Sequence, residues 1–376
     1  MPSMNSLLSR FADPTLSRGL LQKVREKAVR YKKQHGRSPV MMEVCGSHTV
    51  SLAKSGIKQA LHNEITFIAG PGCPVCVTDQ SDIDQMIRIA DEPGVIVCTF
   101  GDMLRVPGSH GSLLTRKSAG ADIRMIYNPV EAVVVAQENP DKKIVLLGIG
   151  FETTMPLHAA ALKLAVEQDI HNFSIWMAAK LVPPIMHAIL ASAEVKIDSF
   201  LLPGHASVVL GRSIYDETLA PYQIPGAIAG FEPVEMLGAV YKILTRLIDK
   251  TFEIDNCYPM VVREEGNPHA KSLMEQYFTP CGTVWRGMGS IPQSGLMIRE
   301  EYSSWDARKI FSGLPEIKPR KTACRCGDIL RGTANPADCP LFAKACAPAN
   351  PIGPCMVSGE GACGAYFQYL REDILV

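Results

Sequence analysis

The chain has 376 residues, of which 47% are apolar and 20% charged, and its net charge is zero. This length predicts two or three domains, and the composition excludes a disordered or fibrous chain. The neutral balance of charge gives no reason to expect nucleic acid or an acidic membrane as a partner. Since neither a signal-peptide core nor a run of 18 apolar residues is present, we expect a cytoplasmic protein.

The N-terminal segment is basic. Residues 1–40 carry nine Lys and Arg but only two acidic residues. We predict a basic helix over 1–35, in which Asp13 is the N-cap and Pro14 lies in the first turn. Such a run of charge is interpreted as a solvated helix face.

Eight short apolar runs alternate with amphipathic stretches up to about residue 255. Strands alternating with helices predict parallel sheets with helices on both faces. We expect two such α/β units, over 36–140 and 141–255, followed by a looser segment over 256–376. The eight predicted strands are Val40–Val44, Ile65–Ala69, Val95–Phe100, Ile123–Tyr127, Ile144–Ile149, Phe173–Met177, Phe200–Leu202 and Ala227–Ala229.

A short internal similarity supports two units. Residues 144–166 and 227–248 both give a strand, then Gly-Phe-Glu, then an apolar helix. The acidic residues of the two motifs are Glu152 and Glu232. The alternative to a functional role is that each simply complements the dipole of the helix that follows it. Glu152 is the stronger functional candidate because two threonines follow it.

The C-terminal segment contains six cysteines with prolines between them and no helical or strand period. Such a segment cannot bury a conventional core, so we expect thiolate ligands to order it. The spacing lacks the paired C-x₂₋₄-C knuckles of structural zinc and the C-x₂-C-x₂-C run of ferredoxins. Six cysteines suffice for four cluster ligands and one thiol pair. An iron–sulfur cluster is favoured, with zinc as the alternative. The six are Cys324, Cys326, Cys339, Cys346, Cys355 and Cys363.

Two further cysteine motifs follow the first two predicted strands. Cys45-Gly-Ser-His48 comes after one, and Gly72-Cys73-Pro-Val-Cys76 comes after the next and precedes a helix. Both therefore lie where open parallel sheets bind ligands. A helix N-terminus favours thiolate, and C-x-x-C is the spacing of a reversible disulfide, so we interpret Cys73 and Cys76 as functional rather than as a buried thiol pair. His48 is a candidate ligand or proton donor.

The remaining motifs are weaker. Gly148-x-Gly150 lacks the third glycine of a dinucleotide fingerprint, and no phosphate-binding P-loop sequence is present, so we do not expect a nucleotide site. Three other cysteines have no neighbouring motif and are interpreted as core or inert; they are Cys98, Cys257 and Cys281.

Taken together, the motifs resemble those of the HypD family of [NiFe]-hydrogenase maturation proteins. The similarity covers nearly the whole chain and includes the Cys45 and C-x-x-C motifs, Gly150-Phe-Glu-Thr-Thr154 and the cysteine pattern of the tail. Val50 stands where some members have a further His, which puts any role of that His in doubt. The resemblance implies two Rossmann-like α/β domains and a third domain that binds a [4Fe-4S] cluster.

The resemblance also implies a function and partners. With the small chaperone HypC, such a protein is a scaffold on which an iron ion receives two cyanides and one carbon monoxide, and HypE donates the cyanide. Cys45 would be the iron ligand on this chain, beside a redox-active pair formed by Cys73 and Cys76. His48 and Glu152 complete the expected site. By similarity with ferredoxin:thioredoxin reductase, Cys326 and Cys355 would form a second pair next to the cluster, whose ligands would be Cys324, Cys339, Cys346 and Cys363.

Two other classes of protein are compatible with the same residues. An iron–sulfur electron carrier or thiol–disulfide reductase needs the cluster and the C-x-x-C motif but not Cys45-x-x-His48 beside it. A zinc-stabilised α/β binding module needs only a set of thiolates.

Overall fold

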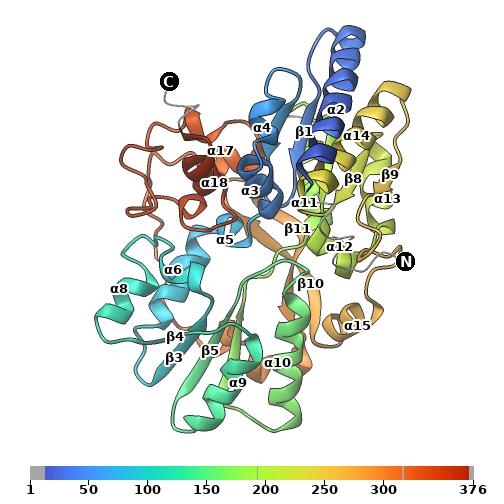
Figure 1. Cartoon of the computed structure of the whole chain (residues 1–376). Helices are drawn as coiled ribbons and strands as arrows, with labels where there is room; N and C mark the ends of the chain where they lie inside the picture. The colour runs from blue at the N-terminus through green and yellow to red at the C-terminus, as the bar shows by residue number, and fades with distance from the viewer. Residues whose placement is uncertain (1–12, 193, 316, 372–376) are drawn as a thin grey trace.

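The computed structural model describes residues 13–192, 194–315 and 317–371. Over these ranges the chain forms two parallel β-sheets surrounded by helices, one antiparallel hairpin and an irregular cysteine-rich segment (Figure 1). The expected α/β class is thus confirmed, and the two parallel sheets are consistent with two Rossmann-like units. No helix in the described ranges has the length and apolar character needed to cross a membrane.

The larger sheet has five strands in the order β2-β1-β7-β8-β9, all paired in parallel. Its central strands β7 and β8 are buried along their whole length, as expected where helices cover both faces of a parallel sheet. The strands span Val40–Glu43 (β1), Thr66–Ala69 (β2), Ser199–Pro203 (β7), Gly226–Ala229 (β8) and Ile254–Asn256 (β9).

The smaller sheet has four parallel strands in the order β4-β3-β5-β6. It lies with helices α9 and α10 in the lower half of Figure 1. Its strands span Val95–Thr99 (β3), Asp122–Met125 (β4), Lys143–Gly148 (β5) and Phe173–Met177 (β6).

All eight predicted strands are present, but the two sheets do not follow the predicted division at residue 140. The range 36–140 supplies β1 and β2 to the larger sheet and β3 and β4 to the smaller one, and 141–255 likewise supplies both sheets. Parallel strands are joined by crossovers, so the chain leaves one sheet, builds the other and returns. Periodicity along the sequence does not show which of the two sheets a given strand joins.

The predicted basic helix is α2, Pro14–His35. The Asp13 carboxylate accepts from the backbone N–H of Thr15 at 2.7 Å, and Gly36 ends the helix with φ +70°. The buried face of α2 packs against α14, Pro233–Asp249, which lies beside it in Figure 1. The part of the prediction over residues 1–12 lies outside the described residues.

The other helices are mostly short and connect the strands. They are α3 (Gly46–Lys54), α4 (Ile57–Ala60), α5 (Pro74–Val77), α6 (Gln80–Ile89), α7 (Gly101–Leu104), α8 (Leu113–Ser118), α9 (Pro129–Glu138), α10 (Met155–Glu167), α11 (Val182–Ser192), α12 (Gly204–Leu210), α13 (Ser213–Leu219), η1 (Ala220–Tyr222), α15 (Pro268–Tyr277), η2 (Glu300–Trp305) and α16 (Ala307–Ile310).

An antiparallel hairpin, β10 (Phe278–Trp285) and β11 (Gly289–Ile298), was not expected from the sequence. It contacts a segment that follows the larger sheet and a segment that follows the smaller sheet. Trp285 is fully buried and bridges to Thr78 just after the C-x-x-C motif, while the carbonyl of Ser294 accepts from Leu181 N–H at 2.9 Å, after β6.

The cysteine-rich segment contains only short helices, as its irregular pattern predicted. It nevertheless shares the largest hydrophobic core of the molecule, which also includes residues from both sheets. Its elements are α17 (Cys326–Arg331), η3 (Pro336–Asp338), η4 (Pro354–Met356) and α18 (Ala362–Tyr369).

Candidate cysteine site

The two N-terminal cysteine motifs meet at the carboxyl edge of the larger sheet, because β1 and β2 are parallel neighbours. Cys45 is the N-cap of α3 and Cys73 is the N-cap of α5. The backbone N–H of Gly46 donates to the carbonyl of Gly72 at 3.1 Å. Added to Gly72, a Cβ would lie 2.6 Å from Cys45 Cα, so only glycine permits this approach.

Cys73 and Cys76 form a disulfide, with Cα atoms 5.2 Å apart and both side chains buried. The Cys73 sulfur also accepts from the backbone N–H of Cys76 at 3.2 Å. Helix α5, which carries Cys76, packs against α17 and η4 of the cysteine-rich segment.

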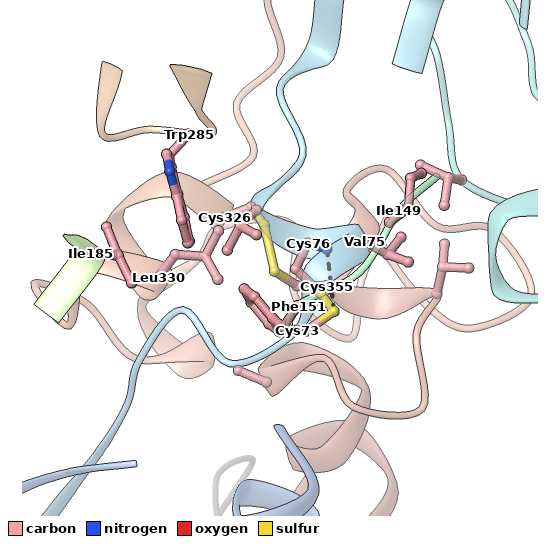
Figure 2. Packing of buried hydrophobic residues seen from close by; sticks show 14 of the residues in the cluster. Cys73, Val75, Cys76, Ile149, Phe151, Ile185, Trp285, Cys326, Leu330 and Cys355 are labelled. Carbon is pink, nitrogen blue, oxygen red and sulfur yellow. Dashed lines mark hydrogen bonds between the residues drawn. A yellow bond between two sulfur atoms is a disulfide. The ribbon is translucent and has the colours of Figure 1, made fainter. Parts of the chain in front are cut away.

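A second disulfide joins Cys326, the first residue of α17, to Cys355 in η4, with Cα atoms 6.4 Å apart. Both cysteines are buried. Figure 2 shows the two pairs in the same packed region, with Phe151 and Trp285 nearby. Since α5 contacts both elements that carry the second pair, the structure brings the two pairs together across a long separation in sequence.

The remaining four cysteines of the tail are free of disulfides and line one small cavity. Apolar side chains such as Ile329 and Phe342 complete its wall, and no carboxylate of the described residues lines it. Burial raises the pKa of Cys363, and negative charge on the other three thiols raises it further, which reflects their proximity. The four thiols are those of Cys324, Cys339, Cys346 and Cys363.

This donor set fits an iron–sulfur cluster in its chemistry, since it offers four sulfur donors in an apolar cavity. Among the described residues, however, no three His, Cys, Asp or Glu side chains converge to hold a metal ion. A [4Fe-4S] cluster takes one thiolate on each of four iron atoms, so its ligands surround a cavity rather than a single point.

Cys45 is buried beneath the tail. The Ser47 hydroxyl donates to Glu360 Oε1 at 2.6 Å, and Gly46 packs against the backbone of Glu360. Burial raises the pKa of the Cys45 thiol to about 11, and the charge of Glu360 acts in the same direction. The thiol is therefore protonated at neutral pH until a cation displaces its proton.

The His48 side chain has no thiol or carboxylate as a hydrogen-bond partner among the described residues. Its Nε2 lies 3.0 Å from the carbonyl oxygen of Gly230 and 3.2 Å from that of Ala229, and its ring stacks on Phe231, which also stacks on His205. Burial lowers the pKa of His48 to about 4, so the ring is neutral and donates through Nε2. His48 thus ties the first motif to the Gly-Phe-Glu turn after β8.

Glu152 follows β5 and is buried. Its Oε1 accepts from the backbone N–H of Val182 at 2.8 Å, while Oε2 is buried with no partner among the described residues. Burial raises the pKa of Glu152 to about 7. A carboxyl group with that pKa exchanges protons near neutral pH.

Sequence reasoning missed two residues of this region, Glu360 and Tyr215. Tyr215 is fully buried and hydrogen-bonds to Ser207 at 3.1 Å. Burial raises its pKa, and the charges of Glu152 and Cys45 raise it further, so the phenol lies near both. No motif marks Tyr215, whereas Glu360 stands between two cysteines of the tail, a position that could have drawn attention.

The three cysteines without a motif take no part in this arrangement. Cys98 is buried in β3, and Cys257 and Cys281 are half-buried after β9 and in β10. None of the three forms a disulfide.

Fold and site together define an α/β protein in which two cysteine pairs and a set of four thiols gather at the carboxyl edge of a parallel sheet. A family model named HypD, described as the hydrogenase formation hypA family, matches residues 17–370. The chain belongs to the HypD family.

Several relatives match over nearly their full length. The hydrogenase maturation factor HypD of Escherichia coli K12 is 40% identical over 94% of this chain and 95% of the relative. The HypD of Rhodobacter capsulatus is 40% identical over 96% of this chain and 97% of the relative. The HypD of Azotobacter vinelandii is 42% identical over 88% of this chain and 89% of the relative. The resemblance stated from the motifs is thereby confirmed.

Proposed function

We propose that this protein acts in hydrogenase maturation as a redox-active scaffold which, with HypC, holds iron while two cyanides and one carbonyl are attached. Membership of the HypD family and relatives named hydrogenase maturation factors support the role in maturation. The observation that carries the scaffold proposal is the assembly of Cys45, the C-x-x-C disulfide and the tail at one sheet edge. HypE would deliver the cyanide, and the work would take place in the cytoplasm.

Cys45 is proposed as the iron ligand of this chain. Low-spin iron that carries cyanide and carbonyl is soft and favours thiolate. Burial removes Cys45 from water, and the nearby carboxylate of Glu360 favours a cation at this position. Glu152 is proposed as a group that accepts or releases a proton as the charge of the site changes, since its Oε2 has no partner among the described residues.

The four free thiols of the tail are proposed to hold a [4Fe-4S] cluster, which when bound would store and release single electrons. Their common apolar cavity and their lack of disulfides support this assignment. Zinc remains the alternative for a Cys₄ set, and iron and zinc analysis of anaerobically purified protein decides between them.

The two disulfides are proposed to exchange two electrons. Thiolate attack by reduced Cys326 and Cys355 on the Cys73–Cys76 disulfide would oxidise Cys326 and Cys355 to a disulfide and leave Cys73 and Cys76 as two thiols. Packing of α5 against α17 and η4 supports this exchange. The electrons would then be available beside Cys45.

The scaffold proposal is tested by Cys45→Ala in the complex with HypC. We expect infrared bands of iron-bound cyanide and carbonyl to disappear while the visible absorption of the cluster stays. Cys98→Ala, which removes another buried cysteine, is the matched control and retains both signals. Loss of both signals from Cys45→Ala would instead indicate a structural role for Cys45.

The exchange is tested by Cys326→Ser. We expect a normal cluster absorption and a loss of hydrogenase maturation. Undiminished maturation with a normal cluster would refute the relay.

A thiol–disulfide reductase or electron carrier is the second candidate, favoured by the two disulfides near one thiol set. It requires no iron at Cys45. Wild-type protein whose two disulfides can be reduced and re-oxidised, but which shows no infrared bands of iron-bound cyanide or carbonyl in the presence of HypC, would support this candidate over the scaffold.

A further inference from the structure

The sulfur groups described above reach the surface at one place. Of the two disulfide pairs and the four cavity-lining thiols, only Cys324 is not buried. The chain holds no reductant of its own among the described residues, so electrons must enter from outside. The surface around Cys324 is therefore the shortest route by which electrons can reach the buried cysteines.

A cavity of about 650 Å³ opens beside Cys324 and also reaches Cys326. Its wall combines residues from the start of α17, from the turn of the β10–β11 hairpin and from the loop before Cys324. The wall carries four cationic side chains: Arg286, Arg320, Lys321 and Arg325. We refer to it as the cationic cavity.

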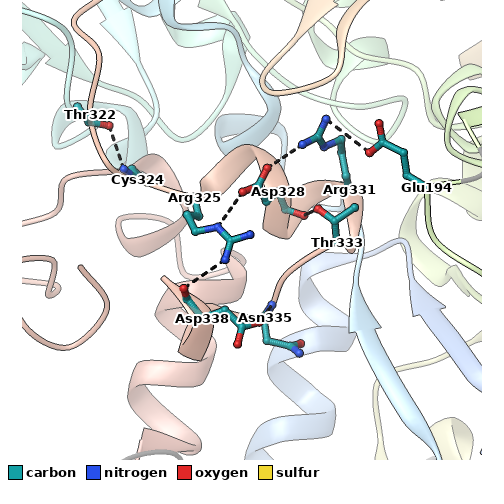
Figure 3. Close-up of polar contacts among 9 residues, drawn as sticks. All are labelled: Glu194, Thr322, Cys324, Arg325, Asp328, Arg331, Thr333, Asn335 and Asp338. Carbon is teal, nitrogen blue, oxygen red and sulfur yellow. Dashed lines mark hydrogen bonds and ion pairs between the residues drawn. The ribbon is translucent and has the colours of Figure 1, made fainter. Parts of the chain in front are cut away.

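The positive charge of the cationic cavity is poorly neutralised. Asp328 is the only carboxylate in its described wall, and Arg325 and Arg331 already pair with it at 2.8 and 2.7 Å (Figure 3). Arg320 and Lys321 are exposed. Since the chain as a whole has no net charge, this is a local excess.

Arg286 adds an unsatisfied donor. Its Nε and Nη1 donate to neutral oxygens, the carbonyl of Thr78 at 3.0 Å and Oε1 of Gln80 at 2.9 Å. Its Nη2 is buried and has no partner among the described residues. An unpaired guanidinium nitrogen is costly to bury, and neither of the oxygens that Arg286 does bond cancels its positive charge.

We propose that the cationic cavity is the docking site for an acidic protein that carries single electrons. Its carboxylates would bind the rim at Arg320 and Lys321, and its redox centre would come to lie next to Cys324. Complementary charge steers such encounters, which are weak and short-lived in electron transfer. A small anion would match the charge but would bring no electrons, which is why a carrier protein is favoured.

The inference rests on the proposed function, because it assumes that Cys326 and Cys355 are reduced in turn. Reduction of one disulfide takes two electrons. Two carrier molecules each lose one electron, and with two protons these convert the Cys326–Cys355 disulfide to two thiols.

The test uses the full-length protein under anaerobic conditions with reduced plant-type [2Fe–2S] ferredoxin, an acidic carrier. The rate of thiol release at Cys326 and Cys355 is measured by alkylation and mass spectrometry, and the Kd for oxidised ferredoxin is measured at low and high salt. Arg320→Glu/Lys321→Glu reverses the rim. Lys54→Glu/Lys242→Glu makes the same change of net charge at exposed sites elsewhere.

We expect the rim reversal to raise the Kd and lower the rate with ferredoxin by about tenfold or more, while the control pair stays within about twofold of wild type. High salt should weaken wild-type binding and leave the rim variant little changed. Reduction by dithiothreitol, which is neutral, should be equal in all three proteins.

Other outcomes would overturn the inference. Equal ferredoxin rates in wild type and rim variant would show that docking lies elsewhere, and equal losses in both variants would show that only net charge matters. Binding of single-stranded RNA as tight as that of ferredoxin would show a general polyanion site. If neither reductant released thiols at Cys326 and Cys355, the proposed function itself would fail, whereas success with dithiothreitol alone would remove only the docking site.

Discussion

Gly72 is the residue on which the approach of the two N-terminal motifs depends. A Cβ there would lie 2.5 Å from Gly46 N and 2.6 Å from Cys45 Cα, and backbone atoms cannot rotate away. We predict that Gly72→Ala lowers the free energy of unfolding by about 2 kcal/mol or more and moves Cys45 away from Cys73. Chemical denaturation measures the first effect, and loading of the iron site proposed at Cys45, in the presence of the proposed partner HypC, measures the second.

Gly238 provides the matched control, since no atom in the described part of the chain lies within 4 Å of a Cβ added at this position in helix α14. Gly238→Ala is expected to stabilise the protein by about 0.5–1 kcal/mol through helix propensity. If Gly72→Ala behaved like Gly238→Ala, the close approach seen at Gly72 would not hold in solution.

His158 makes the fold sensitive to acid. Burial lowers its pKa from 6.5 to about 4, its Nδ1 lies 3.0 Å from the carbonyl of Thr154, and its Nε2 has no partner among the described residues. As the pH falls below 6.5, His158 in the unfolded state binds a proton before His158 in the folded state does. The neutral buried ring therefore makes its full contribution to the free energy of unfolding above pH 6.5, and this contribution is lost as the pH falls towards 4.

We predict that His158→Gln loses less stability than wild type between pH 7.5 and 5, by about 2 kcal/mol. Denaturation at the two pH values measures the difference, and only the change with pH matters, because the substitution also alters stability at pH 7.5. Equal losses in both proteins would mean that His158 is protonated in the fold without cost.

The limits of sequence reasoning are clear at single residues. Cys45 and Cys73 could be placed together because both follow neighbouring strands. Glu360 and Tyr215 could not, because each reaches the region from an element far along the chain and nothing local predicts that path. The expected role of His48 as a ligand or proton donor stays a prediction: its Nε2 donates to backbone carbonyls after β8, and its Nδ1 has no partner among the described residues.

At the scale of elements, the parallel strands were predictable and the hairpin was not. Strands buried on both faces read as short apolar runs, and all eight of those predicted are present. In β10–β11 the pattern is obscured by Pro280 and Pro292, by a register shift after Cys281 and by Gln293 at φ +52°. Strand β9 has only three residues, too few for a period to appear.

Trp285 at the end of β10 holds the hairpin against the C-x-x-C helix. It is fully buried, its Nε1 donates to Ser294 Oγ at 2.8 Å, and it bridges to Thr78. We predict that Trp285→Ala lowers the free energy of unfolding by about 3–5 kcal/mol. It should also speed reduction of the Cys73–Cys76 disulfide by dithiothreitol, measured by alkylation, because the end of α5 loses its support.

The control is Val284→Ala, since this neighbour is 43% exposed. It is expected to change stability by no more than about 0.5 kcal/mol and to leave the reduction rate unaltered. A stable Trp285→Ala variant with a wild-type reduction rate would show that the hairpin does not support α5.

At the scale of the whole molecule, the tail connects the two sheets. Ser358 donates to Asp102 in α7, after β3 of the smaller sheet, at 2.9 Å. Two residues further on, Glu360 accepts from Ser47 in α3, after β1 of the larger sheet, at 2.6 Å. The same short stretch thus contacts both halves, and its position depends on how the cysteines around it are held.

Removal of the metal proposed for the four free thiols therefore has a predicted spatial pattern. The tail has little regular secondary structure, so thiolate ligands should supply much of its order. We predict that anaerobic treatment with an iron chelator raises hydrogen exchange in residues 324–363 and in α3, which contacts the tail through Glu360 and α18.

The central strands of the smaller sheet, β3 and β5, serve as the internal control, because their exchange depends on core packing and should stay unchanged. Mass spectrometry of peptides before and after chelation measures both regions in one experiment, and iron and zinc analysis of the same samples shows which metal has left. If the tail kept its protection after the metal was gone, the Cys326–Cys355 disulfide and the shared core would be sufficient to order it, and the four free thiols would have no structural metal to hold.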